Sequence, residues 1–130
     1  MLFRSDRTFQ LWDYQVSHKW MLVRSPASPR IRNNVDVLFF GVQYMAIPTC
    51  FVGLEVGQAT PEDVVSLRRL VGEPDMPGLY YLSTSDGRYF VSALGFKVYE
   101  NDLDIFESGL ATYFWSNDPA SVFGTLLAHS

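Results

Sequence analysis

Three side chains in this sequence could act as a nucleophile or a general base: His18, His129 and the single cysteine, Cys50. A Ser-His-Asp triad or a Cys-His pair needs the base within hydrogen-bonding reach of the nucleophile, and a third group that orients the base. His18 has no nucleophile-elbow motif beside it, and His129 lies one residue before the last position, where chains tend to fray. We therefore predict no catalytic residue. We expect His18 at the corner of a hairpin and Cys50 as a small buried hydrophobe.

Metal and cofactor sites require donors or glycine loops at characteristic spacings. The sequence has two histidines and one cysteine, which are too few for a nitrogen or sulfur cage around a transition metal. Neither the glycine pattern of dinucleotide-binding loops nor the Gly-Lys-Ser/Thr run of phosphate-binding loops occurs. We therefore predict no metal site and no cofactor, and a single cysteine excludes an intramolecular disulfide.

Acidic residues alternate in the segment YENDLDIFE, residues 99–107. In an extended chain alternate side chains point to one face, so the carboxylates would repel one another and attract a cation or a basic partner. The run does not match the spacing of an EF-hand loop, and a tight turn at Asn101 and Asp102 would separate the carboxylates. A solvated turn and a protein-binding surface both remain open. The predicted partner-binding residues are Tyr99, Glu100, Asp102, Asp104 and Glu107.

Aromatic residues are abundant, with ten Phe, seven Tyr and three Trp among 130 residues. A β core would absorb many of these rings, whereas an exposed set would form an interface or line an apolar pocket. As an alternative to the acidic surface, we predict a small-ligand pocket built from the aromatic N-terminal strands. Its predicted lining residues are Trp12, Tyr14, His18 and Tyr44.

The charge is unevenly distributed along the chain. Residues 1–32 hold six Lys or Arg and two Asp, a net of +4, and the remainder holds four Lys or Arg and twelve acids, a net of −8. Either the two halves neutralise each other across the fold, or the field attracts a charged partner. Arg24, Arg30 and Arg32 lie near Trp20, a combination that can hold phosphates and stack bases. Because the whole chain carries −4, we do not expect nucleic-acid binding.

The elements that position these residues are mostly strands, since β-branched and aromatic residues dominate the runs between turn signals. Trp12, Tyr14, Val16 and His18 follow one another at intervals of two residues along the first strand and into its turn, so we expect them to share the inward face. Ser85 to Gly87 is a strong hairpin signal. The predicted strands cover residues 8–17, 19–25, 35–47 and 50–56, a pair on either side of the Ser-Asp-Gly turn within 78–100, and residues 103–108.

Two helices are also predicted. In TPEDVVSLRRLVG, Thr60 can cap the helix, Pro61 suits its first position and Gly72 supplies a C-terminal stop. Val64 and Leu67 fall on one stripe of this helix, which should pack on the sheet. The segment NDPASVFGTLLAH, residues 117–129, has a capping Asp, a Pro at the first position and an apolar stripe, and predicts a C-terminal helix.

These elements predict one domain over residues 1–130 with a mainly β (α+β) fold: an antiparallel sheet, sandwich or partly open barrel of about seven strands with one or two helices. The first residues lack an apolar signal segment, so we expect a cytoplasmic protein. The longest uncharged run, residues 37–54, contains two glycines and a proline and would make a poor membrane helix. We therefore expect no membrane association.

The segments LWDYQVSHKWMLVRSP and VDVLFFGVQYMAIPT resemble a group of small uncharacterised bacterial β-rich proteins, some of them immunity-like. The resemblance covers the first 55 positions and transfers no catalytic or binding residue. It implies a compact interaction module. We therefore predict a non-catalytic protein-interaction module, immunity-like or a subunit of a complex, with a protein partner or a second copy of the chain. The alternative is a small-ligand-binding β domain, or an enzyme that lacks a recognisable motif.

Overall fold

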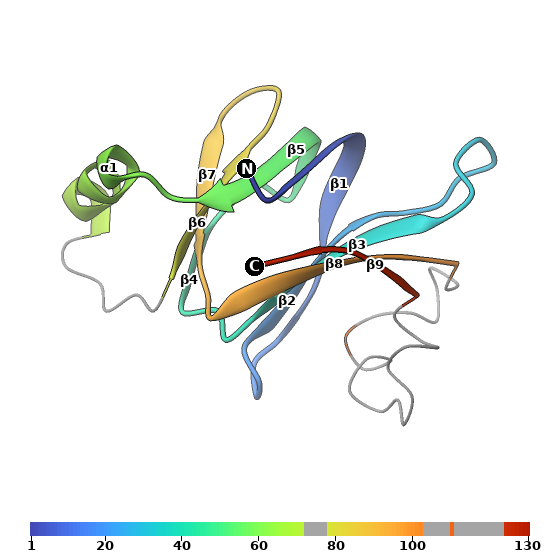
Figure 1. The fold of residues 1–130 in the computed structure, drawn as a ribbon. Helices are drawn as coiled ribbons and strands as arrows, with labels where there is room; N and C mark the ends of the chain where they lie inside the picture. The colour runs from blue at the N-terminus through green and yellow to red at the C-terminus, as the bar shows by residue number, and fades with distance from the viewer. Residues whose placement is uncertain (72–77, 103–109, 111–123) are drawn as a thin grey trace.

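Figure 1 shows the computed structural model, which describes residues 1–71, 78–102, 110 and 124–130. The described residues form one antiparallel sheet in the order β4-β7-β6-β5-β1-β2-β3-β8-β9, with one helix. The predicted mainly β fold with an antiparallel sheet is therefore confirmed, and the sheet runs open from β4 to β9. The elements are β1 (Phe3–Gln15), β2 (Trp20–Ser25), β3 (Asn34–Phe40), β4 (Tyr44–Ala46), β5 (Cys50–Gln58), α1 (Pro61–Val71), β6 (Leu79–Ser83), β7 (Arg88–Ser92), β8 (Gly95–Asn101) and β9 (Thr125–His129).

The predicted strand over residues 35–47 is divided at Gly41, which explains one of the additional strands. Gly41 has a φ of 59°, in the left-handed region, and a Cβ there would lie 2.6 Å from the Leu94 Cδ1 atom. The chain therefore leaves β3 at this glycine and crosses to β4, which pairs with β7 at the opposite end of the sheet order. Three backbone hydrogen bonds hold this corner: Val42 N–H to Lys19 O, Gln43 N–H to Ser92 O, and Leu94 N–H to Phe40 O, at 2.8 to 2.9 Å.

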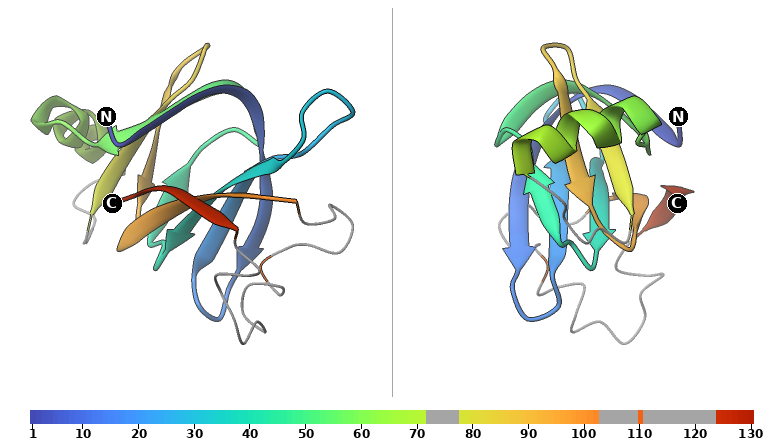
Figure 2. Two further views of the ribbon diagram at one scale, coloured as in Figure 1. Left: turned by 45° about the vertical axis from the view of Figure 1, so that its right-hand side comes forward. Right: turned by 90° about the vertical axis from the view of Figure 1, so that its left-hand side faces the viewer.

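The sheet curls so that one of its faces encloses the main hydrophobic core, as the two views of Figure 2 show. Tyr80 of β6 has its ring centroid 6.2 Å from Phe39 of β3 and 5.4 Å from Phe96 of β8, although β6 and β3 are four places apart in the sheet. Fully buried Phe9 of β1 contributes to the same core. The curl therefore lets a single sheet bury its own concave face, as a partly open barrel does.

A bulge at Trp12 corrects the predicted inward face of β1. Leu11 pairs with Val23 and Asp13 with Leu22, so Trp12 is an extra residue in the ladder. Before the bulge Phe9 and Leu11 contact the main core, which is the face opposite to the predicted one. Trp12 instead packs on a smaller cluster formed by Leu22, Leu38 and Leu110 on the other face of the sheet. The simple alternation of side chains between the two faces fails here, because a bulge shifts all later side chains by one position.

The C-terminal prediction is wrong where the structure describes it. Residues Thr125–His129 form β9, which pairs with β8, and not the end of a helix. The apolar residues Leu126 and Leu127 suited a helical stripe and a strand equally well, and pairing with the long β8 decides in favour of the strand. The predicted strand over residues 103–108 and the start of the predicted helix lie outside the described residues.

The hairpin of β6 and β7 and the helix α1 are confirmed. The Thr84 N–H donates to the Gly87 carbonyl at 2.8 Å and closes the predicted turn. Thr60 caps α1 as predicted, since its Oγ1 accepts from the Asp63 N–H at 3.1 Å and the Asp63 carboxylate accepts from the Thr60 N–H at 2.8 Å. Figures 1 and 2 place α1 at the β5–β6–β7 end of the curled sheet.

Candidate functional site

An ion pair between α1 and β7 fixes the position of the helix. The Arg88 guanidinium donates to both carboxylate oxygens of Asp63, at 2.7 and 2.9 Å. This charged hydrogen bond is the main reason that the pKa of Asp63 falls from 3.8 to about 2. The guanidinium also lies 3.9 Å from the ring centroid of Tyr81, whose hydroxyl donates to Glu55 at 2.9 Å. Residues from β5, β6 and β7 therefore hold the first turn of α1.

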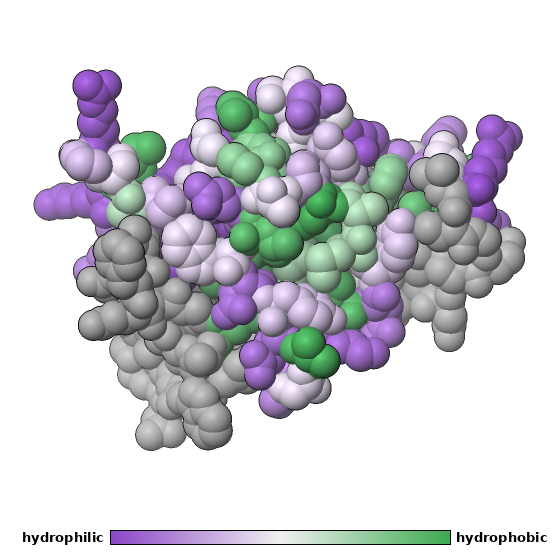
Figure 3. All heavy atoms as spheres, turned by 180° about the vertical axis from the view of Figure 1, so that it is seen from behind, coloured by the Kyte–Doolittle hydropathy of each residue, from purple (hydrophilic) through white to green (hydrophobic). Residues whose placement is uncertain are grey.

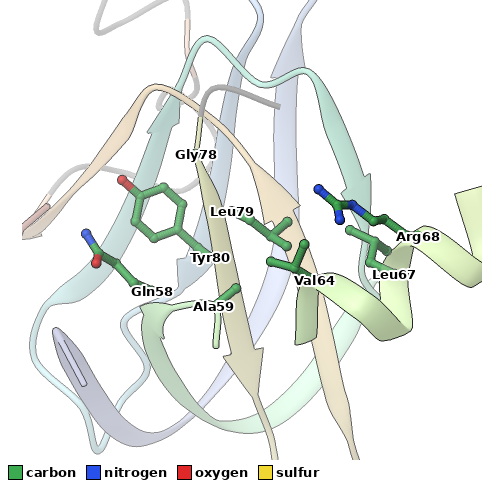
Figure 4. Close-up of a pocket in the computed structure, with 8 residues that line it drawn as sticks. All are labelled: Gln58, Ala59, Val64, Leu67, Arg68, Gly78, Leu79 and Tyr80. Atoms are coloured by element: carbon green, nitrogen blue, oxygen red, sulfur yellow. The ribbon is translucent and has the colours of Figure 1, made fainter. Parts of the chain in front are cut away.

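The rest of α1 stands over a pocket of about 410 Å³ at the end of β5 and the start of β6 (Figure 4). Its walls combine the predicted helix stripe with residues of the two strand ends. Val64 and Leu67 face Leu79 across the pocket, so its middle is apolar. The lining residues are Gln58, Ala59, Val64, Leu67, Arg68, Gly78, Leu79 and Tyr80.

Polar groups flank this apolar middle on two sides. Figure 4 shows the side chains of Gln58 and Tyr80 on one side and the Arg68 guanidinium on the other. Tyr80 as a whole residue is only 6% exposed, and its ring belongs to the main hydrophobic core. Arg68 is the only charged residue among the eight that line the pocket. The pocket thus offers hydrogen-bonding groups and a positive charge around an apolar body.

A close backbone approach shapes the wall of the pocket at Gly78. The Gly78 carbonyl accepts from the Ala93 N–H at 3.0 Å, and a Cβ at Gly78 would lie 2.8 Å from the Ala93 carbonyl oxygen. Any larger residue would push β6 away from the chain that follows β7. Glycine is therefore required where the pocket begins, for reasons of space.

The predicted partner-binding residues do not form one exposed acidic surface in the described part of the chain. Tyr99 is 8% exposed, and burial raises the pKa of its phenol. Glu100 is half-buried and accepts a hydrogen bond of 2.9 Å from the Asn33 side chain. Asp102 is exposed. Asp104 and Glu107 lie outside the described residues.

The residues of the predicted N-terminal pocket are divided among separate places. Because of the bulge, Trp12 packs on the smaller cluster, whereas Tyr14 pairs with Met21, a residue of the main core. His18 lies exposed in the turn between β1 and β2, with its Nδ1 2.9 Å from the neighbouring Ser17 Oγ. Tyr44 lies on the edge strand β4. The position of His18 at a hairpin corner is therefore confirmed.

Cys50 and His129, the other two residues that could act as a nucleophile or a base, are both exposed. Cys50 is exposed at the start of β5, next to the buried Phe51, so the prediction of a buried thiol is wrong. The alternation of β5 explains this, because Phe51 takes the core-facing position. His129 is exposed on β9, where it pairs with Lys97.

Arg24 belongs to a buried polar network and not to a basic surface. Its guanidinium donates to both Asp36 carboxylate oxygens, at 2.6 and 2.8 Å, and both side chains are 0% exposed. The Asn101 amide donates to Asp36 at 2.9 Å, and the Asn34 amide donates to Asn101 at 3.0 Å. The guanidinium also lies 5.1 Å from the Trp12 ring centroid. Arg24, one of the six cations within residues 1–32, is therefore neutralised inside the fold.

Comparison with known proteins gives no matching family model, no matching curated protein and no matching solved structure. Within the described ranges, no helix is long and apolar enough to cross a membrane. The same residues contain no group of three or more His, Cys, Asp or Glu side chains arranged to hold a metal ion. The pocket beside α1 is therefore the candidate site on geometry alone.

The helix stripe of this pocket is predictable from the sequence, but the pocket itself is not. The spacing of Val64 and Leu67 predicts that both pack on the sheet. The opposite wall depends on Gln58 and Leu79, which become neighbours of the helix only because β5 pairs with β6. That pairing cannot be read from spacing in the sequence.

Proposed function

We propose that this chain binds a small, largely apolar molecule in the pocket between α1 and the strands β5 and β6. The observation that carries the proposal is a pocket of about 410 Å³ whose middle is lined by Val64, Leu67 and Leu79 and whose one side carries the hydrogen-bonding side chains of Gln58 and Tyr80. A ligand with an apolar body and a polar group could cover the apolar residues and hydrogen-bond to these side chains.

The size and lining of the pocket agree with such a role. Ligand sites are usually concave, mainly apolar and about 300 to 1,000 Å³ in volume, with a few polar groups that orient the ligand. A pocket of about 410 Å³ lies near the lower end of this range. Burial of the ligand against Val64, Leu67 and Leu79 would supply most of the affinity, and the polar groups would supply specificity.

The test uses the neutral fluorescent probe N-phenyl-1-naphthylamine, whose emission rises in apolar surroundings. At about −0.3 kcal/mol per non-hydrogen atom, a probe of this size should bind with a sub-millimolar Kd. The substitution Val64→Trp fills the pocket from the helix and should abolish binding. Val65→Trp is the matched control, because Val65 is the next residue of α1 and is 50% exposed. Equal binding by both variants, each with an unchanged circular dichroism spectrum, would refute the proposal.

A second candidate is a protein-interaction module whose partner is another copy of the chain. Figure 3 shows hydrophobic side chains in the middle of the face seen from behind. On the opposite side of the molecule, at the front in Figure 1, the edge strand β9 exposes Leu126 and Leu127 by 48% and 44% and carries no Asp, Glu, Lys or Arg. Edge strands usually carry charges or prolines that prevent pairing. An uncharged strand can pair antiparallel with its own copy without opposing like charges.

Sedimentation velocity over a range of concentrations tests this second candidate. We expect a dimer that the substitution Leu126→Lys converts to a monomer. Val52→Lys is the control, because Val52 is 53% exposed on the interior strand β5. A wild-type chain that stays monomeric at every concentration, or a dimer insensitive to Leu126→Lys, would exclude pairing through β9.

A further inference from the structure

The loop between β2 and β3, residues 26–33, projects beyond the sheet and carries two cations at its tip (Figures 1 and 2). We infer that this basic loop binds an acidic surface of another protein, with Arg30 and Arg32 on carboxylates and Ile31 in an apolar hollow between them. The inference goes beyond the proposed function, because the basic loop shares no residue with the pocket at α1 or with the edge strand β9.

A tight turn forms the tip of the basic loop. Ser28 and Ile31 exchange two backbone hydrogen bonds, from Ser28 N–H to Ile31 O at 2.8 Å and from Ile31 N–H to Ser28 O at 3.1 Å. Pro29 takes the second position of this four-residue turn, which its fixed φ suits. The Ser28 Oγ also accepts from the Arg30 N–H at 3.3 Å. The tip therefore has one defined backbone shape.

The Arg7 side chain of β1 fixes the base of the basic loop. Its guanidinium donates to the carbonyl oxygens of Ser25, Pro26 and Asn33, at 3.0, 3.3 and 2.7 Å. Its Nε donates to the Ser25 Oγ at 2.9 Å. These bonds join both arms of the loop to one side chain of a neighbouring strand. A loop that is already held in its bound shape loses little conformational entropy on binding, so more of the contact energy appears as affinity.

The charges of Arg30 and Arg32 are available to a partner. Both residues are exposed, and neither side chain forms an ion pair or a hydrogen bond with any residue that the structure describes. Residues 26–33 contain no Asp or Glu. At about 3.3 Å per residue, the tip extends about 10 Å past the ends of β2 and β3. This exceeds the Debye length at cellular salt, so charges beyond the base of the loop are largely screened from the tip.

The composition of the tip favours a protein over a nucleic acid as the partner. Ile31 is 41% exposed between the two arginines, and an aliphatic side chain beside arginine is a typical anchor of protein interfaces. The basic loop contains no aromatic residue that could stack on a base. Trp20 lies at the opposite end of β2, and Arg24 is bonded to Asp36 inside the fold. A guanidinium fork, in turn, matches the two oxygens of a carboxylate.

A fluorescein-labelled peptide of Glu-Glu-Leu repeats tests the inference by fluorescence anisotropy at cellular ionic strength. We expect the double substitution Arg30→Gln and Arg32→Gln to weaken binding of this peptide about tenfold, the combined effect of two exposed ion pairs. Arg4→Gln with Arg69→Gln is the matched control, because it removes the same charge from two other exposed arginines. The control should change the affinity by less than about twofold, since its charges are screened from the tip.

Two further variants separate a shaped protein contact from simple charge attraction. Ile31→Ser should weaken binding about threefold, whereas Val65→Ser, at a comparably exposed residue of α1, should not. Arg7→Lys keeps the positive charge but loses the fork of hydrogen bonds that holds the loop. It should also weaken binding about threefold, with an unchanged circular dichroism spectrum.

Several results would overturn the inference. These are equal affinities of the two double variants, wild-type affinity of Ile31→Ser or of Arg7→Lys, and no binding of the peptide to the wild-type chain. Single-stranded oligothymidylate serves as the competing probe. If it binds more tightly than the peptide, through the same two arginines and without regard to Ile31→Ser, the basic loop is a nucleic-acid surface and the protein partner is refuted.

Discussion

Replacement of Asp63 by Asn should loosen α1 from the sheet and make the protein less sensitive to acid. The Asp63 carboxylate accepts two hydrogen bonds from Arg88, and its pKa is lowered from 3.8 to about 2. One pKa unit corresponds to about 1.4 kcal/mol, so the full shift represents about 2 kcal/mol of unfolding free energy. The Arg88 side chain is 39% exposed. Because water screens the pair, we expect a contribution of about 1 kcal/mol.

The sign of the pH dependence follows from the direction of the shift. The pKa of Asp63 is lower in the folded chain than in the unfolded chain, so the folded state favours the ionised form. The stabilisation is therefore complete above pH 3.8 and is lost as the pH falls through about 2. Over this interval the wild-type protein should lose about 1 kcal/mol more stability than Asp63→Asn.

Urea unfolding, followed by circular dichroism at neutral pH and at several acidic pH values, measures both quantities. A double-mutant cycle of Asp63→Asn and Arg88→Gln should give a coupling energy of about 1 kcal/mol at neutral pH. Glu62→Gln is the control, because Glu62 lies in the same turn of α1 and is exposed. A coupling energy indistinguishable from zero, with parallel loss of stability on acidification, would refute the role assigned to this ion pair.

Three further predictions concern other parts of the fold. Arg24→Met should reduce the free energy of unfolding by about 3 to 5 kcal/mol in urea, because it leaves the fully buried Asp36 carboxylate without its cation; a loss below about 1 kcal/mol would contradict this. Gly41→Ala should lower the melting temperature, because φ is 59° and the new Cβ would contact Leu94. A melting temperature equal to that of wild type would show that the corner adapts. Cys50 should react with a thiol reagent in the native protein nearly as fast as in urea, because it is exposed; strong protection would place it inside.

The fold class was predictable from the sequence because local signals agreed with the final structure. Thr60 and Pro61 mark the start of α1, and the Ser-Asp-Gly turn marks the β6–β7 hairpin. The faces of β1 were not predictable, because one extra residue at Trp12 reverses the alternation and nothing in its neighbours signals it. The strand β9 was missed since its short apolar run fits a helix as well as a strand.

The candidate site shows the same division between local and long-range information. The apolar stripe of α1 was visible in the spacing of Val64 and Leu67, so half of the pocket could be anticipated. The other half comes from strand ends that meet the helix only through the pairing of β5 with β6. The aromatic residues of the N-terminal strands predicted a ligand pocket there, but their rings mainly fill the two hydrophobic clusters.

The corner at which the chain crosses between the two ends of the sheet has a consequence for variation in sequence. Its three hydrogen bonds join main-chain atoms of residues 19, 40, 42, 43, 92 and 94. Main-chain hydrogen bonds do not depend on side-chain identity, so the curl of the sheet can persist while most of these residues are replaced by others. Gly41 is the exception, because its φ of 59° lies in the left-handed region that residues with a side chain rarely adopt, and a Cβ there would also displace the Leu94 side chain. In distant relatives this glycine should therefore be retained where its neighbours are not.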